Sequence, residues 1–219
     1  MDALNLVALG LGAAWASGIN LYAAVLLLGG LHALGIIPLP PDLQVLSHPA
    51  VLVVAGFLFV VEFVADKVPG VDSMWDAVHS FIRIPAGALL AAGAIGSYGE
   101  GYEVAAALLA GGALAATSHA AKATGRVAIN ASPEPFSNWA VSFLEDLLVL
   151  GGLILALFMP ALFLTLLGIF VVIAIWLLPK LWRGVRRLFG GRRTVGDDRE
   201  DGVPVDFSLL RKKDGAPPP

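Results

Sequence analysis

The sequence predicts an all-α integral membrane protein with about six transmembrane helices. Of its 219 residues, 58% are hydrophobic and only 14% are charged, whereas about a quarter of an ordinary soluble domain is charged. The charges are also unevenly distributed. Of 31 charged residues, 16 lie in the last 40 positions, and the part before them carries 11 acidic and four basic residues. That first part also contains several apolar runs close to the roughly 20 residues that cross a bilayer.

The composition excludes several classes of protein. The apolar part has no basic face, so it is not a nucleic-acid-binding domain. The chain has no cysteine, which excludes disulfide-stapled folds and thiolate metal sites. Membrane lipids are therefore the partners that the sequence predicts, and whether the chain also forms a homo-oligomer stays open.

The first apolar run, residues 4–37, is too long for one straight span, because 34 helical residues extend about 50 Å. Ser17, Gly18 and Asn20 interrupt it, so we expect a broken first helix there. Five further spans complete the count: 50–64, 81–98, 102–121, 141–158 and 161–178.

Prolines mark the breaks between the later spans. Pro160 predicts a hairpin between the last two spans, with one kinked helix as the alternative. Residues 132–139 contain two prolines and are expected to form a rigid loop. Three spans followed by three would place the two halves in opposite orientations, so a 3+3 inverted repeat is a hypothesis, although the similarity between the halves is slight.

The basic residues predict the orientation of the spans. With six spans, the Lys and Arg residues of the body fall in or beside segments 65–80 and 122–140, and the loops on the other side have none. The positive-inside rule then places both termini in the cytoplasm of a multi-pass protein of the cell inner membrane. We expect a transmembrane domain over 1–183 and a cytoplasmic tail over 184–219, basic at first and then disordered.

The first of two polar segments starts at the end of the second span. Glu62 and Asp66 are four residues apart and so share a helix face. A break at residues 69–70 follows, and Asp72 is a suitable N-cap for the next helix. Asp76, His79 and Arg83 then continue along one face of that helix.

The second polar segment places His119, Lys122, Arg126 and Asn130 on one helix face, because they are spaced three, four and four residues apart. Glu145 and Asp146 follow near the start of the fifth span. The two segments could simply pair, Lys122 with Glu62 or Asp66 and Arg126 with Asp146, since charges at membrane depth are costly unless paired or hydrated.

Pairing does not account for every carboxylate. Seven acidic residues face only four basic ones in this region; the acidic ones are Glu62, Asp66, Asp72, Asp76, Glu134, Glu145 and Asp146. The excess predicts a cation-attracting transport site formed by Glu62, Asp66, Asp72, Asp76 and Asp146. Asn20, in the middle of the first span, either lines the path or forms a hydrogen bond between helices.

The two histidines of these segments have alternative roles. His79 and His119 are candidate proton carriers. Together with Glu62 and Asp66 they could instead bind a divalent cation such as manganese or zinc. No dense ligand motif such as His-Glu-x-x-His is present, so whether a metal is bound stays open.

The basic stripe supports a rival interpretation. Lys122, Arg126 and Asn130 could bind the phosphate of a lipid headgroup. Catalysis on such a lipid would also need a nucleophile and a proton donor within hydrogen-bond reach. Ser118, Ser132 and His119 are candidates, but nothing in their spacing selects them. The sequence therefore favours a function other than catalysis and does not decide the question.

Three segments resemble a known family: ASGINLYA (16–23), EFVADKVPGVDSMWDAVHSFIRIPAGALLAA (62–92) and SHAAKATGRVAINASPEPFSNWAVSFLED (118–146). They are similar to the prokaryotic and plastid membrane proteins that share domain of unknown function 4126. The resemblance covers residues 5–180 and implies a compact polytopic membrane protein. It brings no established activity and assigns no role to any residue.

Three functions are therefore under consideration. The first is a small transporter or channel for a cation or a proton-coupled solute. The second is a translocase or enzyme that acts on a phosphate-bearing lipid. The third is a membrane scaffold without catalytic activity. The carboxylate excess favours the first.

Overall fold

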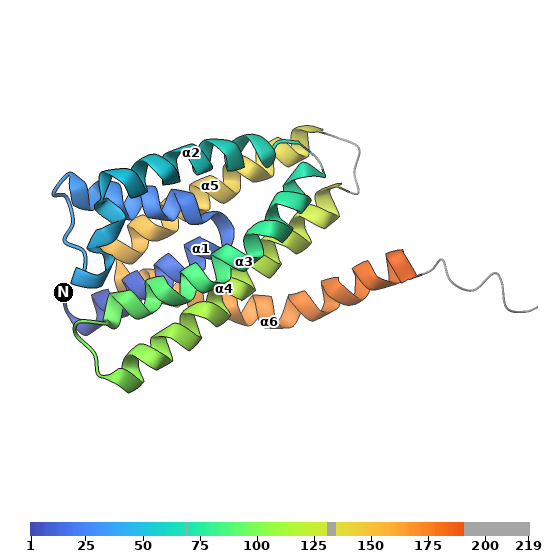
Figure 1. The fold of residues 1–219 in the computed structure, drawn as a ribbon. Coiled ribbons are helices and arrows are strands. Elements are labelled where there is room, and N and C mark those ends of the chain that lie inside the picture. Colours follow the sequence, from blue (N-terminus) through green and yellow to red (C-terminus); the bar gives the residue numbers. More distant parts are fainter. Residues whose placement is uncertain (69, 131–134, 191–219) are drawn as a thin grey trace, which may run out of the picture. The chain divides into compact units, whose positions relative to one another are not determined.

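The computed structural model describes residues 1–68, 70–130 and 135–190, and the regular structure in this part of the chain is entirely helical. The elements in order are α1 (Ala3–Ala33), the 3₁₀ helix η1 (Pro41–Ser47), α2 (Pro49–Ala65), α3 (Val71–Ile95), α4 (Gly101–Asn130), α5 (Pro135–Phe158) and α6 (Pro160–Gly190). Figure 1 shows their arrangement. The all-α prediction is confirmed.

The helices have the length and surface of a multi-pass membrane protein. Five of them are long and apolar enough to cross a bilayer, or up to six if η1 and α2, which meet at a 62° bend, form one span. Large apolar side chains point outward: Phe81 is 85% exposed and Phe57 is 67% exposed. Lipid rather than water accounts for such a surface, because each exposed aromatic ring would be costly in water.

The first helix breaks where the sequence predicts. Asn20 has an extended backbone conformation, with φ of −147° and ψ of 95°, inside α1. Its side-chain Oδ1 accepts the backbone N–H of Ala23 at 2.9 Å. Asn20 therefore ends the first half of α1 and caps the start of the second half.

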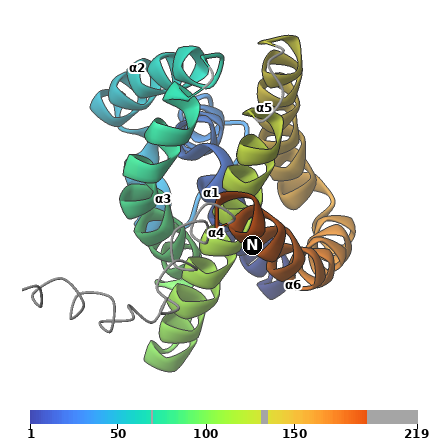
Figure 2. The same ribbon diagram turned by 90° about the vertical axis from the view of Figure 1, so that its right-hand side faces the viewer.

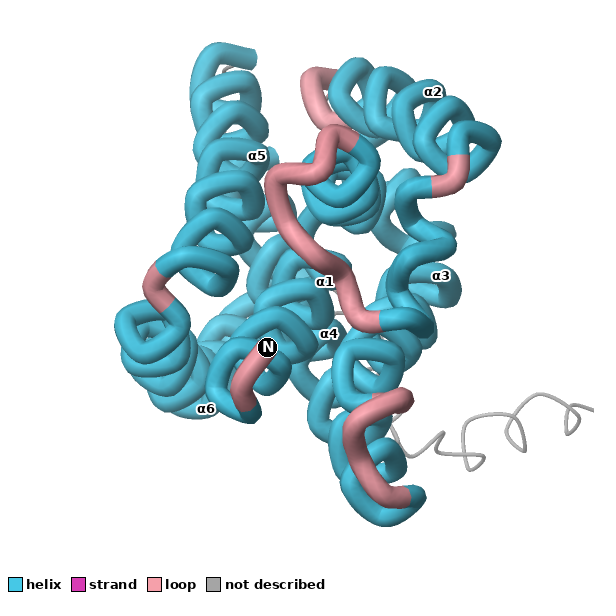
Figure 3. The backbone as a smooth tube through the Cα atoms, turned by 90° about the vertical axis from the view of Figure 1, so that its left-hand side faces the viewer, coloured by secondary structure: helices cyan, strands magenta, loops and turns pink. Residues whose placement is uncertain are grey.

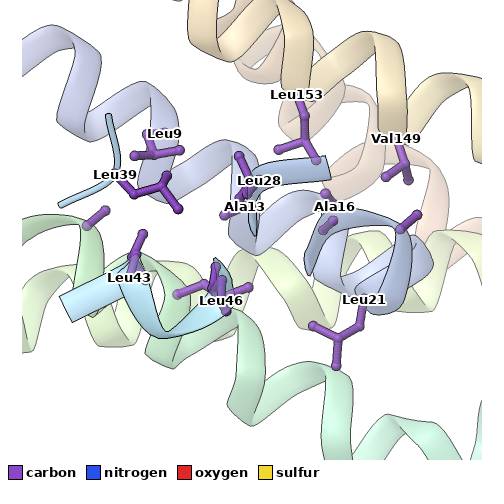
Figure 4. Close-up of a cluster of buried hydrophobic side chains, with 14 of the residues drawn as sticks. Leu9, Ala13, Ala16, Leu21, Leu28, Leu39, Leu43, Leu46, Val149 and Leu153 are labelled. Carbon is purple, nitrogen blue, oxygen red and sulfur yellow. The ribbon is translucent and has the colours of Figure 1, made fainter. Parts of the chain in front are cut away.

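The two halves of α1 run in opposite directions (Figure 1). Gly10 in the first half lies against Ala94 near the end of α3, and Gly29 in the second half lies against η1, which contacts the same end of α3. Leu9 and Leu28 belong to one apolar cluster, which Figure 4 shows in close-up. The α1 helix is therefore a hairpin that enters the bundle and returns to the end at which it started.

This hairpin differs from the predicted first span. The prediction counted residues 4–37 as one crossing, whereas α1 starts and ends at the same end of the bundle; the side of the membrane on which each terminus lies stays a prediction. Helices α2 to α6 run alternately from one end to the other (Figure 1), so the start of α1 lies at the end opposite the α2–α3 turn. Figure 3 looks onto the end that holds the α1–α2 connection and the α3–α4 turn, where Ser97 Oγ donates to Asp42 Oδ2 at 3.0 Å.

Several predicted helix boundaries also change. The α3 helix begins at Val71, ten residues before the predicted span. Gly70, with φ of +87°, takes the N-cap position predicted for Asp72, whose Oδ1 accepts the Gly70 N–H instead. The α5 helix begins at Pro135, so the expectation of a loop as far as residue 139 is wrong. Proline suits a first helical position, where no intrahelical partner for an N–H exists.

The later breaks agree with the sequence analysis. Residue Met159 separates α5 from α6, and α6 runs back in the opposite direction (Figure 1), as the predicted hairpin requires. The tail from residue 191 onward lies outside the described residues, so the disordered tail stays a prediction. The predicted division at 183/184 falls inside α6 and also stays a prediction. The inverted repeat also stays a hypothesis.

The α1 hairpin lies in the centre of the compact unit Met1–Leu181 and packs on α2, α3, α4 and α5 (Figure 2). Small residues make this close packing possible. A Cβ at Gly18 would overlap Ser118 Oγ and the Ala115 carbonyl of α4, and a Cβ at Gly87 would overlap the Ala115 side chain. The core therefore brings the tip of the hairpin directly against α3 and α4.

Candidate functional site

Charged side chains from α2, α3, α4 and α5 meet beside the tip of the α1 hairpin. We call this set the buried charge cluster; it comprises Arg83, Lys122 and Arg126 with Glu62, Asp66, Asp72, Asp76, Glu145 and Asp146. Ion pairs link all of these residues except Asp146, which accepts a hydrogen bond from Asn20 at the hairpin tip. The structure thus brings together the two polar segments that the sequence analysis singled out.

Arg83 is fully buried in the middle of α3 and bridges two carboxylates. Its Nη2 donates to Glu62 Oε1 at 2.6 Å, and its Nη1 donates to Asp76 Oδ1 at 2.7 Å. Asp76 and Arg83 are seven residues apart on one face of α3, as the spacing predicts. Two short charge-assisted hydrogen bonds fix the guanidinium between α2 and α3.

Lys122 of α4 lies at the centre of the cluster. Its Nζ is 3.0 Å from Asp66 Oδ2 and 3.4 Å from Glu62 Oε1. It is also 3.5 Å from Asp76 Oδ1 and 3.7 Å from Glu145 Oε2. One ammonium group therefore serves four carboxylates contributed by three different helices.

Arg126 connects the cluster to α5. It pairs with Glu145 through Nη2 and through Nε at 3.2 Å, and its Nη2 is 3.2 Å from Asp66 Oδ2. Its Nη1 donates to Asn138 Oδ1 at 2.7 Å and lies 3.9 Å from Asp72 Oδ2. Arg126 therefore pairs with Glu145 rather than with the neighbouring Asp146 that the pairing hypothesis named.

Negative charge exceeds positive charge in this cluster, because six carboxylates accompany three cations. Lys67, the fourth cation of the sequence count, lies beside the cluster over the Phe63 ring. Three carboxylate oxygens are also buried without any hydrogen-bond partner in the described part of the chain: Glu62 Oε2, Asp66 Oδ1 and Asp76 Oδ2. Glu134, the other carboxylate of the sequence count, lies outside the described residues. Such oxygens are expensive in a low-dielectric interior unless a proton or a cation occupies them.

The tip of α1 is attached to the cluster by three hydrogen bonds. Asn20 Nδ2 donates to Asp146 Oδ1 at 2.9 Å, and Lys122 Nζ donates to the Ile19 carbonyl at 3.1 Å. Ser17 Oγ donates to the Arg83 carbonyl at 2.7 Å. The broken helix thus presents its unpaired backbone and its amide side chain to the charged groups.

The two histidines lie beside the cluster. His79 Nδ1 is 2.9 Å from the Trp75 carbonyl, and its ring stacks on Trp75 with 4.0 Å between the ring centroids. His119 Nε2 is 2.6 Å from Ser80 Oγ. In the described part of the chain, His, Asp and Glu side chains form no group of three or more that could hold a metal ion. The metal candidates Glu62, Asp66, His79 and His119 are therefore not brought together as ligands.

The candidate phosphate ligands are engaged elsewhere. Lys122 and Arg126 pair with carboxylates of the cluster, and their side chains are buried, at 1% and 0% exposure. Asn130 ends α4, but its side chain lies outside the described residues. The arrangement is suited to holding positive charge among carboxylates.

Sequence reasoning did not select two residues of the site. Asn138 accepts a hydrogen bond from Arg126, and Ser17 anchors the hairpin tip to α3. For Asn138 a weak signal exists, because Asn138, Ser142 and Glu145 follow a four-three spacing on one face of α5. Ser17 marks the interruption of the first helix, but its hydrogen-bond partner Arg83 lies 66 residues further along the chain, so the spacing gives no signal for this contact.

The comparisons with known proteins identify a family and no function. Neither the curated proteins nor the solved structures provide a match to this chain. A family model described as a domain of unknown function (DUF4126) matches residues 7–180, which is most of the chain and includes the whole charge cluster. The chain therefore belongs to the DUF4126 family, as its three characteristic segments predict.

Proposed function

We propose that the protein is a small membrane transporter that exchanges protons for a cation or small cationic solute at the buried charge cluster. The observation that carries the proposal is the excess of carboxylates in the cluster, four buried and two partly buried beside three buried cations. One oxygen on each of Glu62, Asp66 and Asp76 also has no hydrogen-bond partner in the described part of the chain. No other group of charges in the described part of the chain lies as deep in the bundle.

The energetics support exchangeable positive charge at this site. An unpaired carboxylate at membrane depth costs several kcal/mol, so the excess must be neutralised. A proton on one of the unpartnered oxygens removes the charge without needing a ligand shell. A cation that enters the cluster replaces such a proton, and the two species compete for the same carboxylates. Competition of this kind is the basis of exchange transport.

The hairpin tip offers a way in which binding of a cation or proton to the cluster could change the conformation of the protein. Transporters often place broken helices at their ion sites, where the unpaired backbone groups coordinate the ion. In this protein Lys122 donates a hydrogen bond to the Ile19 carbonyl, and Asp146 accepts one from the Asn20 side chain. A change in the charge of the cluster alters both bonds, so binding and release are coupled to the position of the tip.

The basic residues support an orientation in the cell inner membrane. Lys67 lies in the α2–α3 turn, and Lys122 and Arg126 pair with Asp66, which precedes that turn directly. By the positive-inside rule the end of the bundle that holds this turn faces the cytoplasm. The start of α1 then faces the outer side.

The geometry favours this function over the two alternatives. A lipid phosphate would have to displace carboxylates from Lys122 and Arg126 and would leave their negative charges unpaired. A pure scaffold does not need buried excess charge, because an apolar core of the same volume is at least as stable.

The test is the collapse of a pH gradient across proteoliposomes, followed with an entrapped pH-sensitive dye. Sodium, potassium and small organic ammonium ions are added one at a time to purified protein in vesicles that are acidic inside. At least one of these cations should dissipate the gradient several times faster than in protein-free vesicles. Collapse at the protein-free rate with every cation would contradict the proposal.

A further inference from the structure

A second feature of the bundle adjoins the charge cluster. A cavity of about 520 Å³ lies between α1, α4, α5 and α6, within the range of roughly 300–1,000 Å³ that is typical of small-molecule sites. Its walls are largely apolar and include Trp15, Leu155 and Phe170, while Lys122 and Glu145 form its polar end.

The cavity exists because α5 has two adjacent glycines facing it. A Cβ at Gly152 would overlap the Trp15 ring, so Gly152 allows the indole to pack against the α5 backbone. A Cβ at Gly151 would meet nothing within 4 Å. Gly152 thus serves close packing, whereas Gly151 leaves open space that a larger side chain would fill.

The cavity opens toward the lipid. Leu147, Leu148 and Leu166 line it and are 66%, 49% and 47% exposed, respectively. They belong to the apolar outer surface that the bilayer covers. A ligand that enters between them must therefore be apolar along most of its length.

The inner end of the cavity adjoins the buried charge cluster, in which carboxylates outnumber cations; Glu145 itself is paired there with Arg126 and Lys122. The Glu145 side chain is 14% exposed and lines the cavity, whereas the side chains of Glu62 and Asp76 are 0% and 2% exposed. Lys122, the cation at this end, is already shared among four carboxylates. An anionic headgroup would add to the surplus negative charge, and a hydroxyl would leave it unchanged. A protonated amine would reduce it and donate hydrogen bonds to Glu145.

We infer that the cavity binds a single-chain amphiphilic amine, with the apolar chain among α5 and α6 and the protonated amine beside Glu145. This inference rests on the proposed function in one respect, namely that the charge cluster accepts positive charge from outside. It names the class of cation that reaches the cluster through the lipid.

The test is equilibrium binding of tritium-labelled dodecylamine to the full chain in phosphatidylcholine nanodiscs, whose headgroups offer no N–H donor. Binding to empty nanodiscs is subtracted. We expect one saturable site per chain and at least about tenfold weaker binding of dodecanol and dodecanoate in competition, since the charge-assisted bond to Glu145 is lost. Glu145→Gln should weaken dodecylamine binding by a similar factor.

A filled cavity gives the matched control. Gly151→Leu should abolish the saturable binding, because the new side chain occupies the open space, whereas Gly168→Leu on the outer face of α6 should leave it unchanged. Equal affinity for the amine and the alcohol in the wild-type protein would overturn the inference and indicate a plain acyl-chain site. Binding by Gly151→Leu at wild-type affinity would also overturn it. Because binding is measured without a gradient, the result is independent of whether the protein transports.

Discussion

At the scale of single residues, Arg83 shows how the cluster is held together. Its guanidinium is fully buried and neutralises Glu62 and Asp76 across the α2–α3 interface. Breaking a buried ion pair by removing one partner is far more costly than never having built it, because the remaining charges stay buried without compensation.

Arg83→Gln should therefore lower the free energy of unfolding by about 3–5 kcal/mol, because two carboxylates lose their closest cation. The measurement is denaturant-induced unfolding in mild detergent. Lys180→Gln, which changes an exposed cation on α6 whose ammonium lies over the Trp176 ring, should cost less than about 1 kcal/mol. Adding Glu62→Gln to Arg83→Gln should restore part of the loss; additive losses in the double variant would contradict the bridging role.

Helical spacing predicted correctly which residues share a face of one helix. It did not predict which residue of a neighbouring helix that face meets, because this depends on how the helices are rotated against each other. The four-residue spacing placed Asp72, Asp76 and Arg83 on one buried face of α3. It could not determine whether Glu145 or Asp146 faces Arg126, because neighbouring residues point about 100° apart and only packing fixes the rotation. Partners distant in the chain, such as Ser17 and Arg83, leave no local signal at all.

At the scale of elements, the broken first helix is the feature that shapes the site. The sequence indicates the break through its small and polar residues at 17–20, but not the reversal of direction. The reversal depends on close approaches that only the folded chain reveals, such as Gly18 against Ser118 and Ala115 of α4. The break can thus be predicted from the local sequence, whereas the hairpin depends on tertiary contacts.

Gly18→Ala should destabilise the protein by about 1–3 kcal/mol, because its methyl group would overlap the Ala115 backbone carbonyl, which cannot rotate away. Gly30→Ala, in the second half of the same hairpin, meets nothing within 4 Å. It should be neutral or stabilising by up to about 1 kcal/mol, given the higher helix propensity of alanine. Thermal unfolding of the two variants in one detergent is the measurement. Equal stabilities would show that the tip does not pack on α4.

At the scale of the whole molecule, the distribution of charge predicts which end of the bundle faces the cytoplasm, but it places the N-terminus only if the number of crossings is known. The positive-inside rule orients loops, but a helical hairpin that returns to its starting side has the same composition as a span. Hydropathy could therefore identify residues 4–37 as a membrane segment and could not determine that α1 does not cross.

The chain has no cysteine, so single-cysteine variants report topology without removal of native thiols. Ala3→Cys and Leu34→Cys, at the two ends of α1, should react with a membrane-impermeant maleimide from the same side of the membrane. Val68→Cys, in the α2–α3 turn, should react from the opposite side. Opposite-side labelling of Ala3→Cys and Leu34→Cys would contradict the hairpin.

The central claim is that the surplus carboxylates of the buried charge cluster bind and release the transported charge. The most direct measurement compares gradient collapse in proteoliposomes for Glu62→Gln, which removes one buried carboxylate, and Glu100→Gln, which makes the same change at an exposed position at the far end of the bundle. We expect Glu62→Gln to dissipate the gradient at the protein-free rate and Glu100→Gln to match the wild-type protein. If Glu62→Gln, shown to be folded by its unfolding transition, retains the wild-type rate, the cluster is not the transport site.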